Sequence, residues 1–172
     1  MRPEGSGEPQ GGAPENREEP HQVIACRVVE AELPEVREFL AREWALADRG
    51  LFGADLDWTS RPVVVEARVG RELAGVAVGE AVAGMARLHD LLVTESHRGR
   101  GLGGRLVELF CARAAALGAA RCFLRCPDTP RHRRFYERQG FTAVAVLPRY
   151  YHGHDFVEYL REPLGQEDRG AR

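Results

Sequence analysis

Arg98-Gly99-Arg100-Gly101-Leu102-Gly103-Gly104 is the stretch that decides the fold. It follows an apolar run that ends at Val93, and it opens the most regular helical pattern of the chain, Leu102 to Leu117. A glycine-rich turn between a strand and a helix presents backbone N–H groups to an anion, because glycine allows the main chain to approach closely. Arg98 or Arg100 can add a charge-assisted hydrogen bond. The stretch therefore predicts a phosphate-binding loop.

Three kinds of phosphate-binding loop compete for this stretch. A Walker loop needs Lys followed by Ser or Thr, where this chain has Arg105-Leu106, so that interpretation fails. A dinucleotide fingerprint fits better, because Asp128 lies about where a ribose-binding acid would be and three glycines match G-x-G-x-x-G: Gly99, Gly101 and Gly104. However, the loop falls in mid-chain after an antiparallel region, and too little sequence follows for successive βαβ units.

The third kind is the acyl-CoA loop of the GNAT superfamily. Arg98-x-x-Gly101-x-Gly103, preceded by Leu91-Leu92-Val93, closely resembles that loop. Phe135-Tyr136-Glu137-Arg138-Gln139-Gly140-Phe141 resembles the second motif of the superfamily, Tyr-x-x-x-Gly-Phe, at a plausible distance behind the first. The resemblance covers about 23–164, and its specific part is 86–141. Two motifs in the right order favour this family over the dinucleotide fingerprint.

The resemblance implies an acetyl-CoA-dependent N-acetyltransferase that moves an acetyl group to a primary amine by direct attack in a ternary complex. The alternative is a catalytically silent GNAT-like domain that binds acyl-CoA as a sensor or interaction module. A third possibility is a small nucleic-acid-binding domain that uses the cluster Arg131-His132-Arg133-Arg134, which could equally meet CoA phosphates or be a solvated face. Retention of both the glycine loop and Tyr136 favours the enzyme.

The resemblance also implies which residues bind acetyl-CoA. In the superfamily the end of the strand before the loop separates from its neighbour, and its backbone amides hold the thioester carbonyl and the pantetheine. Family members often carry an Asn seven residues before the Tyr, and Thr129 stands there in this chain, where a hydroxyl could substitute. The expected cosubstrate-binding residues are Leu91, Leu92, Val93, Arg98, Gly99, Arg100, Gly101, Leu102, Gly103, Gly104 and Thr129.

Amine acetylation needs groups that move protons. Tyr136 is the expected general acid, because the family places this phenol beside the CoA sulfur and a phenol is a matched donor to a leaving thiolate. An alkylammonium acceptor must first lose a proton, and the candidate bases on the strand are His89 and Asp90. In a regular strand these two point to opposite faces, although a bulge would change that. Glu43 or Asp57 could serve through water.

The acceptor groove in this fold lies between the link at about 50–59 and the loop at 148–155. Arg149-Tyr150-Tyr151 loosely resembles the tyrosine-bearing loop of protein N-terminal acetyltransferases, including those that modify ribosomal-protein alanine. Phe52 and Trp58 could add apolar walls, with Asp55, Asp57 and Asp155 attracting a cation. The acceptor is therefore expected to be a small amine or a peptide N-terminus.

Composition excludes several classes. Hydrophobic residues make up 44% and charged residues 29%, with a formal net charge of -2, so nothing draws the whole chain toward nucleic acid or anionic membrane. No apolar run approaches the ~18 residues needed to span a bilayer. All 24 basic residues are arginine, which is typical of a GC-rich genome and indicates a bacterial source.

The four cysteines, Cys26, Cys111, Cys122 and Cys126, lack paired metal-ligand spacing, and no secretory segment precedes them. We expect reduced, mostly buried thiols, no metal, and a cytoplasmic location. His152 and His154 supply no closed ligand set with these thiols. The sequence leaves a monomer or a homodimer open.

Patterning predicts one mixed α/β domain at 22–164, with a disordered tail at 1–21 and a flexible tail at 165–172. The expected fold is of the GNAT type, with a central, mostly antiparallel sheet of about six to seven strands and helices on both faces. Strands are expected at 23–29, 62–69, 73–81, 85–93, 121–125, 141–147 and 156–161, and helices at 33–47, 102–117 and 130–139.

Overall fold

The computed structural model describes residue 28 and residues 33–164. The predicted tails therefore lie outside the described residues, as does nearly all of the predicted strand at 23–29. The chain separates into two units, Met1–Glu43 and Trp44–Arg172. Helix α1, Pro34–Phe52, begins in the first unit and ends in the second. The sheet, the remaining helices and the site all belong to the second unit.

Helix α1 is longer than the sequence pattern predicted, because it continues through Gly50 to Phe52. Its end is set at Gly53, which has a φ of 68° and donates its backbone N–H to the carbonyl of Arg49 at 3.1 Å. A left-handed glycine of this kind is a common helix terminator. Residues 53–60, within the link expected at about 50–59, are therefore a loop.

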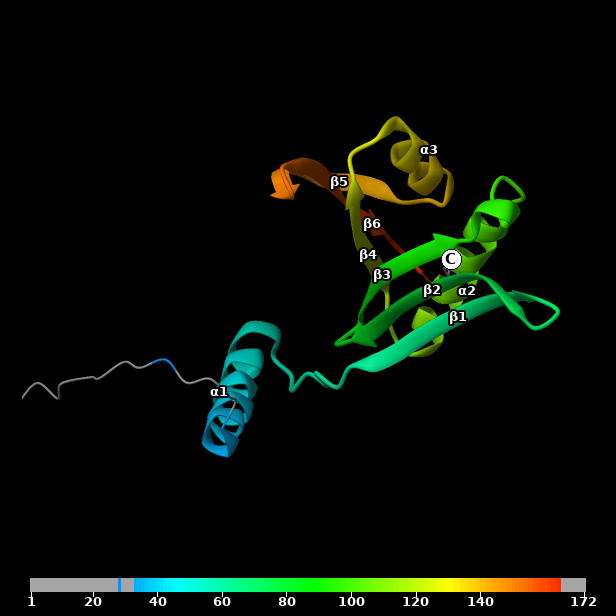
Figure 1. The fold of residues 1–172 in the computed structure, drawn as a ribbon. Helices are drawn as coiled ribbons and strands as arrows, with labels where there is room; N and C mark the ends of the chain where they lie inside the picture. The colour runs from blue at the N-terminus through cyan, green and yellow to red at the C-terminus, as the bar shows by residue number, and fades with distance from the viewer. Residues whose placement is uncertain (1–27, 29–32, 165–172) are drawn as a thin grey trace, which may run out of the picture. The chain divides into compact units, whose positions relative to one another are not determined.

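A six-stranded sheet forms the body of the second unit (Figure 1). Its spatial order is β1-β2-β3-β4-β6-β5, and β3 and β4 pair in parallel while the other neighbours pair antiparallel. This confirms the predicted mixed fold with a mostly antiparallel sheet. The strands are β1 Arg61–Val69, β2 Glu72–Val82, β3 Met85–Val93, β4 Arg121–Pro127, β5 Thr142–Tyr151 and β6 His154–Arg161.

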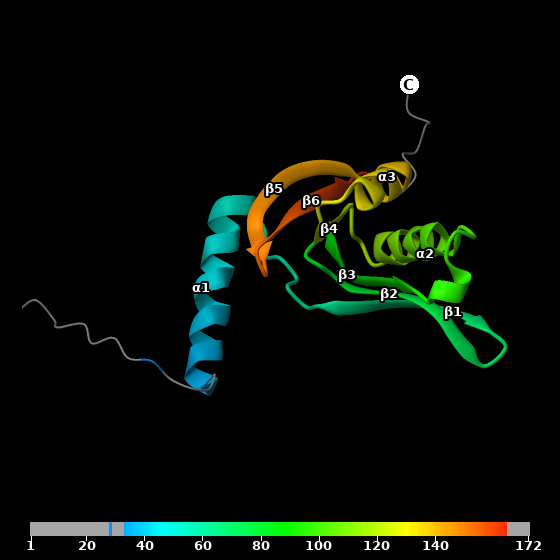
Figure 2. The same cartoon turned by 45° about the horizontal axis from the view of Figure 1, so that its top comes forward.

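Helices α2, Leu102–Ala116, and α3, Pro130–Arg138, pack on one face of this sheet, here called the helix face (Figure 2). Helix α2 buries an apolar stripe that includes Leu106 and Phe110 against β1 to β4. Tyr136 of α3 packs against Tyr159 of β6, with ring centroids 5.6 Å apart. Residues of β2 and β4 alternate in burial accordingly. The opposite face, which carries Val78 and Glu80 of β2, is called the far face.

Strands β3 and β4 separate along their length. They pair at three positions, which end at Arg87 opposite Phe123. Beyond that point β3 continues to Val93 and β4 to Pro127 without pairing to each other, and the two ribbons diverge (Figure 1). The edge of β3 that faces the gap therefore carries main-chain groups that β4 does not use.

A β-bulge lies in β3 at the point where the strands part. Gly79 of β2 is opposite Leu88, but the next residue of β2, Val78, is opposite Asp90, so His89 is the extra residue. The bulge depends on Gly79, because a Cβ there would lie 1.9 Å from the carbonyl oxygen of Arg87. A side chain at 79 would force the two strands apart.

Strands β5 and β6 extend beyond the predicted ranges. The sequence pattern placed a loop at 148–155, but β5 continues to Tyr151 and β6 begins at His154, leaving a tight turn at His152-Gly153. Pro148 lies within β5. It is tolerated because β5 is the edge strand and because the register shifts between Leu147 and Tyr151.

Within the described ranges no helix combines the length and apolarity that crossing a membrane requires. Cys111, Cys122 and Cys126 are buried free thiols in the core.

Candidate functional site

A cavity of about 990 Å³ opens where β3 has left β4. Its walls are the end of β3, the glycine-rich loop, the first turn of α2 and one side of α3. Every predicted cosubstrate-binding residue except Arg100 and Thr129 lines it. The lining residues are Leu91, Leu92, Val93, His97, Arg98, Gly99, Gly101, Leu102, Gly103, Gly104, Pro130, Arg131, His132, Arg134, Phe135, Tyr136, Arg138 and Gln139.

The loop takes its shape from its backbone. Gly101 has a φ of 81°, and it is the N-cap of α2 with no side-chain hydrogen bond to the helix end among the described residues. A Cβ at Gly101 would meet nothing within 4 Å, so the requirement for glycine there is conformational. Arg98 fastens the loop to the end of β3 by donating from Nε to the carbonyl of Val93 at 2.9 Å. The first N–H groups of α2 thus face the cavity ready for an anion.

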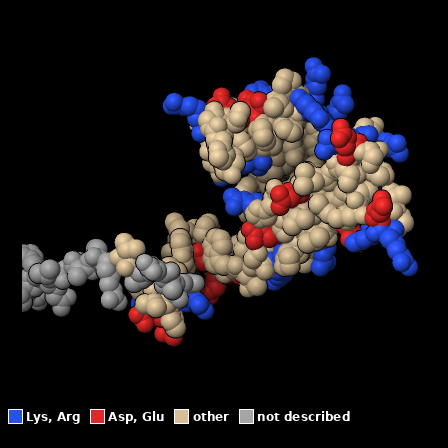
Figure 3. Space-filling model, viewed as in Figure 1, with Lys and Arg blue, Asp and Glu red and all other residues tan. Residues whose placement is uncertain are grey.

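The cavity is lined by positive charge. Four arginines line it, and no Asp or Glu is among the described residues that do so. Arg131, Arg134 and Arg138 share one side of α3 because they are spaced three and four residues apart. In Figure 3 basic side chains gather over α3 and the start of α2, and the surface is hollowed between that region and β3. The cavity therefore suits a ligand that carries several phosphates.

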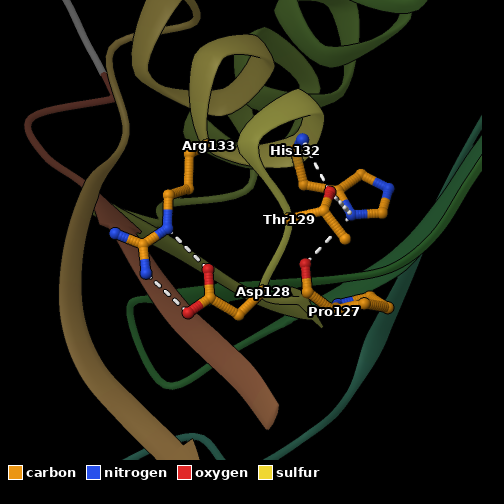
Figure 4. Close-up of polar contacts among 5 residues, drawn as sticks. All are labelled: Pro127, Asp128, Thr129, His132 and Arg133. Carbon is orange, nitrogen blue, oxygen red and sulfur yellow. Dashed lines mark hydrogen bonds and ion pairs between the residues drawn. The ribbon is translucent and has the colours of Figure 1, made fainter. Parts of the chain in front are cut away.

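Thr129 begins α3 and does not line the cavity. Its Oγ1 accepts the backbone N–H of His132 at 3.2 Å, and Nδ1 of His132 lies 3.0 Å from both this hydroxyl and the carbonyl oxygen of Pro127 (Figure 4). The hydroxyl is therefore occupied in capping the helix. His132 lines the cavity in its place.

Asp128, considered above as a ribose-binding acid, is bound within the protein. Its two carboxylate oxygens accept from Nε and Nη2 of Arg133 at 2.5 Å each (Figure 4). Its backbone N–H donates to the carbonyl of Asp155. The hydrogen bond from Arg133 lowers the pKa of Asp128 below its usual value. The pair joins Asp128 to α3, and the backbone hydrogen bond joins Asp128 to the start of β6.

Tyr136 lies at the inner end of the cavity. It is 8% exposed and packs edge-on against Phe135 and Phe141, with centroids 4.9 and 5.9 Å away. Burial raises the pKa of its phenol well above the usual value. The hydroxyl therefore keeps its proton at neutral pH, as a proton donor must.

His89 and Asp90 lie on the same face of the sheet, contrary to the expectation for a regular strand. Asp90 shares the far face with its partner Val78, and His89 lies there too, because its Nε2 is 3.3 Å from Oε1 of Glu80. The bulge causes this because Leu88 and Asp90 lie opposite the adjacent residues Gly79 and Val78, so the extra residue, His89, shares a face with Asp90. Neither residue lines the cavity, whereas Leu91, the residue after Asp90, does.

Across the gap from this pair, the far face of β4 carries Arg125. It donates to Glu158 at 2.9 Å and to the Tyr150 hydroxyl at 3.0 Å, and its guanidinium lies 5.5 Å from the centre of the Tyr150 ring. Tyr150 and Tyr151 in turn pack on Phe156. The predicted tyrosine-bearing segment thus forms an ordered part of β5 beside Arg125.

The acids expected to attract a cation have partners of their own. Asp55 is paired with Arg49, Asp57 with Arg61, and Asp155 accepts the backbone N–H of Arg149 at 2.8 Å. A hydrogen bond from Thr59 lowers the pKa of Asp57. The indole of Trp58 donates to buried Asp48 at 2.7 Å, so that ring has a structural contact. Glu43 is paired with Arg42, in the first unit.

Several lining residues were not predicted. Arg138 and Gln139 lie inside the quoted Tyr136 motif. Helical spacing places Arg138 on the same side as Arg131, and Gln139 on the same side as Phe135, so the sequence could have indicated both as lining residues. The Gln139 amide packs against Gly104, where a Cβ would be only 3.1 Å away. His97 precedes the loop and contacts the Thr94 hydroxyl at 2.9 Å. Nothing in the local sequence marks Glu80, the partner of His89.

Comparison with known proteins agrees with this geometry. The family model described as "Acetyltransferase (GNAT) family" matches residues 28–141. Three solved structures are similar to the chain. The first is an acetyltransferase from Bacillus cereus ATCC 14579, at 16% identity and a TM-score of 0.61, covering 79% of this chain and 97% of that one.

The second is the ribosomal-protein-S18-alanine N-acetyltransferase of Escherichia coli, at 20% identity and a TM-score of 0.57, covering 65% and 76% of the two chains. The third is an aminoglycoside 6'-acetyltransferase type Ii, at 26% identity and a TM-score of 0.54, covering 62% and 71%. No curated protein matches the chain in sequence.

Proposed function

The chain belongs to the GNAT acetyltransferase family, and from that premise we propose that it is an N-acetyltransferase that moves an acetyl group from acetyl-CoA to a primary amine by direct attack in a ternary complex. The observation that carries the proposal is that the glycine loop, four arginines and the protonated Tyr136 line a single cavity. Each part supplies something that the reaction needs.

The charge and the apolar wall of the cavity support acetyl-CoA as the ligand. Its arginines and the first turn of α2 would hold the phosphates, and its apolar wall of Leu91, Leu92 and Val93 would hold the pantetheine arm. The thioester supplies an activated acyl group when acetyl-CoA is bound. Main-chain N–H groups of β3 that do not pair with β4 would stabilise negative charge on the thioester oxygen.

Tyr136 is the proposed general acid. Its raised pKa keeps the proton on the phenol at neutral pH, so the hydroxyl has a proton to give to the leaving thiolate. His89 and Asp90 are the proposed candidates for the proton acceptor, because both lie on the far face at the point where the strands part. The amine would then approach from the far face while the cosubstrate enters from the cavity.

The acceptor is proposed to be a small amine or a peptide N-terminus. Tyr150, Tyr151 and Phe156 offer aromatic surface beside the gap, which suits an apolar group attached to the amine. The similar proteins include one named for ribosomal-protein alanine and one named for aminoglycosides. Their low identity leaves both acceptor classes open for this chain.

Acetyl-CoA as cosubstrate, a cytoplasmic location, a bacterial source, a monomeric or homodimeric state and the absence of metal or nucleic-acid chemistry stay predictions. The alternative function, a silent acyl-CoA-binding sensor, predicts binding without turnover. The catalytic assignment of Tyr136 separates the two possibilities.

The test has two stages. Acetyl-CoA should raise the melting temperature, because a ligand that binds the native state stabilises it, and no shift at millimolar acetyl-CoA would contradict the proposal. A panel of alkylamines and short peptides with free N-termini, followed by thiol detection, should then show CoA release. A melting shift with no release from any acceptor would favour the sensor.

A further inference from the structure

Three polar side chains form a chain on the far face, beside the bulge. Ser60, in the loop before β1, donates from Oγ to Oε2 of Glu80 at 2.5 Å, and the other oxygen of Glu80 lies 3.3 Å from Nε2 of His89. These contacts join the loop, β2 and β3. Glu80 is thereby held at both oxygens, and its second contact holds the imidazole.

We propose that His89 is the base that deprotonates the acceptor ammonium and that Glu80, itself fixed by Ser60, is the positioning residue that orients the imidazole. The inference rests on the proposed function and assigns a role to two side chains, Glu80 and Ser60, that the family motifs do not contain. The motivating observation is the three-residue contact chain at the point where β3 parts from β4.

The orientation determines which nitrogen can act. Because Nε2 faces a carboxylate oxygen, the neutral imidazole keeps its proton on Nε2 and leaves the lone pair on Nδ1. An N–H bond of the acceptor ammonium breaks as an Nδ1–H bond forms, giving a neutral amine and an imidazolium. The amine lone pair is then free to attack, and the imidazolium later returns its proton to water. The Glu80 carboxylate stabilises the positive ring while the charge is present.

His89 is preferred to Asp90 for chemical and structural reasons. An imidazole is ordinarily a much stronger base than a carboxylate, so it is better matched to an ammonium near neutral pH. His89 is also the residue with an orienting partner, whereas Asp90 sits in a regular cross-strand pair with Val78. Asp90 is then suited to attract the cationic acceptor to the gap.

The charges around His89 are mixed in sign. Its own strand supplies Arg87 and Asp90, β2 supplies Glu80, and on the far face of β4 Arg125 is already paired with Glu158 of β6. Arg87 is directed to the Phe123 ring, 4.7 Å from its centre. Glu80 has the lowered pKa of a carboxylate that accepts from Ser60 and His89, so it is ionised at the pH where the enzyme would work.

The test compares two acceptors that differ in basicity. The best alkylamine from the panel is paired with an analogue that carries a trifluoromethyl group on the carbon bearing the amino group, so that it arrives largely unprotonated at pH 7. Glu80→Ala should lower kcat/KM for the alkylamine about ten-fold and His89→Gln about a hundred-fold, while the fluorinated amine loses about two-fold or less in both. The losses for the alkylamine should also shrink between pH 7 and pH 9.5, as more of it becomes neutral.

Glu66→Ala is the matched control. Glu66 is a carboxylate on the same face in β1, paired with Arg68 and away from the bulge, so its variant should match wild type with both amines. Glu80→Gln keeps the side-chain shape and replaces Glu80→Ala if the latter does not fold. Unchanged melting temperatures establish that losses are not due to unfolding.

Each other result contradicts a defined part of the inference. Equal losses with both amines would mean that Glu80 and His89 act on structure alone. An amine-selective loss in Asp90→Asn with none in His89→Gln would make Asp90 the base. Wild-type rates in Glu80→Ala would overturn the positioning role. Acetyl-CoA binding without turnover in wild type would instead overturn the proposed function, and the base assignment with it.

Discussion

The cavity on the helix face and the gap on the far face are built in different ways. The cavity depends on the main chain, with a glycine loop, a helix start and a strand edge, and its arginines add charge around that frame. The far face depends on side chains that a bulge brings together from β2, β3 and the loop before β1. The comparison implies that donor binding resists most side-chain changes, whereas acceptor chemistry depends on a few.

The largest expected effect comes from Tyr136→Phe, which removes a proton donor and leaves the ring. We expect kcat to fall about a hundred-fold or more, with little change in the Kd of acetyl-CoA, because the phenyl ring keeps its packing. Tyr159→Phe is the control. Among the described residues the buried Tyr159 hydroxyl has no hydrogen-bond partner, so removing it should cost neither activity nor stability. Equal effects of the two changes would remove Tyr136 as the acid.

Gly101→Val tests the dependence on the main chain. The φ of 81° strongly disfavours a β-branched residue, at a cost of about 1 to 3 kcal/mol, and the loop should rearrange. We expect the Kd of acetyl-CoA, measured by calorimetry, to rise at least about ten-fold, since each 1.4 kcal/mol is a factor of ten.

Gly70→Val is the matched change, because Gly70 has a φ of 61° in the β1–β2 turn, away from the cavity. Both substitutions should lower the melting temperature by a similar amount, but Gly70→Val should leave the Kd of acetyl-CoA unchanged. A Kd that rises in both variants would show that stability, and not the loop, governs binding.

Arg134→Gln tests whether the arginines add charge around a frame that already binds. Removing one of four lining cations should raise the Kd of acetyl-CoA about ten-fold at low salt, and less at high salt, where exposed charges are screened. Arg71→Gln, at the turn between β1 and β2, should have no effect on the Kd. A salt-independent loss in Arg134→Gln would indicate packing by the side-chain stem instead.

The smallest expected effect concerns the Asp128–Arg133 pair at the start of α3. The folded pKa of Asp128 is lowered, so the pair stabilises the fold above the unfolded value near 3.9, and this contribution disappears as the pH falls through the folded value. Asp128→Asn should therefore lower the melting temperature at pH 7 and leave it unchanged at the acid end. A constant difference across pH 2 to 7 would contradict the ionic origin.

The sequence predicted the cavity better than the far face, and the reason is physical. The glycine-rich loop at 99–104 and the Tyr136 motif are local signals of structure, because a turn and a helix end depend on residues that are neighbours in the chain. The Glu80–His89 contact depends on the register between two strands, and a bulge is not visible in a single strand. His89 and Asp90 were expected on opposite faces only in a regular strand, and the bulge, the exception named above, places them on one face.

Two other differences between the sequence expectations and the structure have separate origins. Thr129 stands at the position of a family contact, but its hydroxyl caps α3 and binds His132, which a motif comparison does not detect. The loop predicted at 148–155 is mostly strand, because an edge position tolerates Pro148. The position of β5 in the sheet determined the outcome for Pro148, whereas a contact within the start of α3 determined it for Thr129.

Gly79 has a consequence for how this protein can change over evolutionary time. With no room for even a methyl group against the Arg87 carbonyl, any replacement at 79 must alter the β2–β3 register, and His89 and Asp90 would move with it. Substitutions of other far-face side chains that suit a new acceptor leave the β2–β3 register in place as long as this glycine is kept. If β2 is randomised and the library is selected for turnover, we expect glycine to be retained at 79. That result would show that the geometry of the bulge requires glycine at this position.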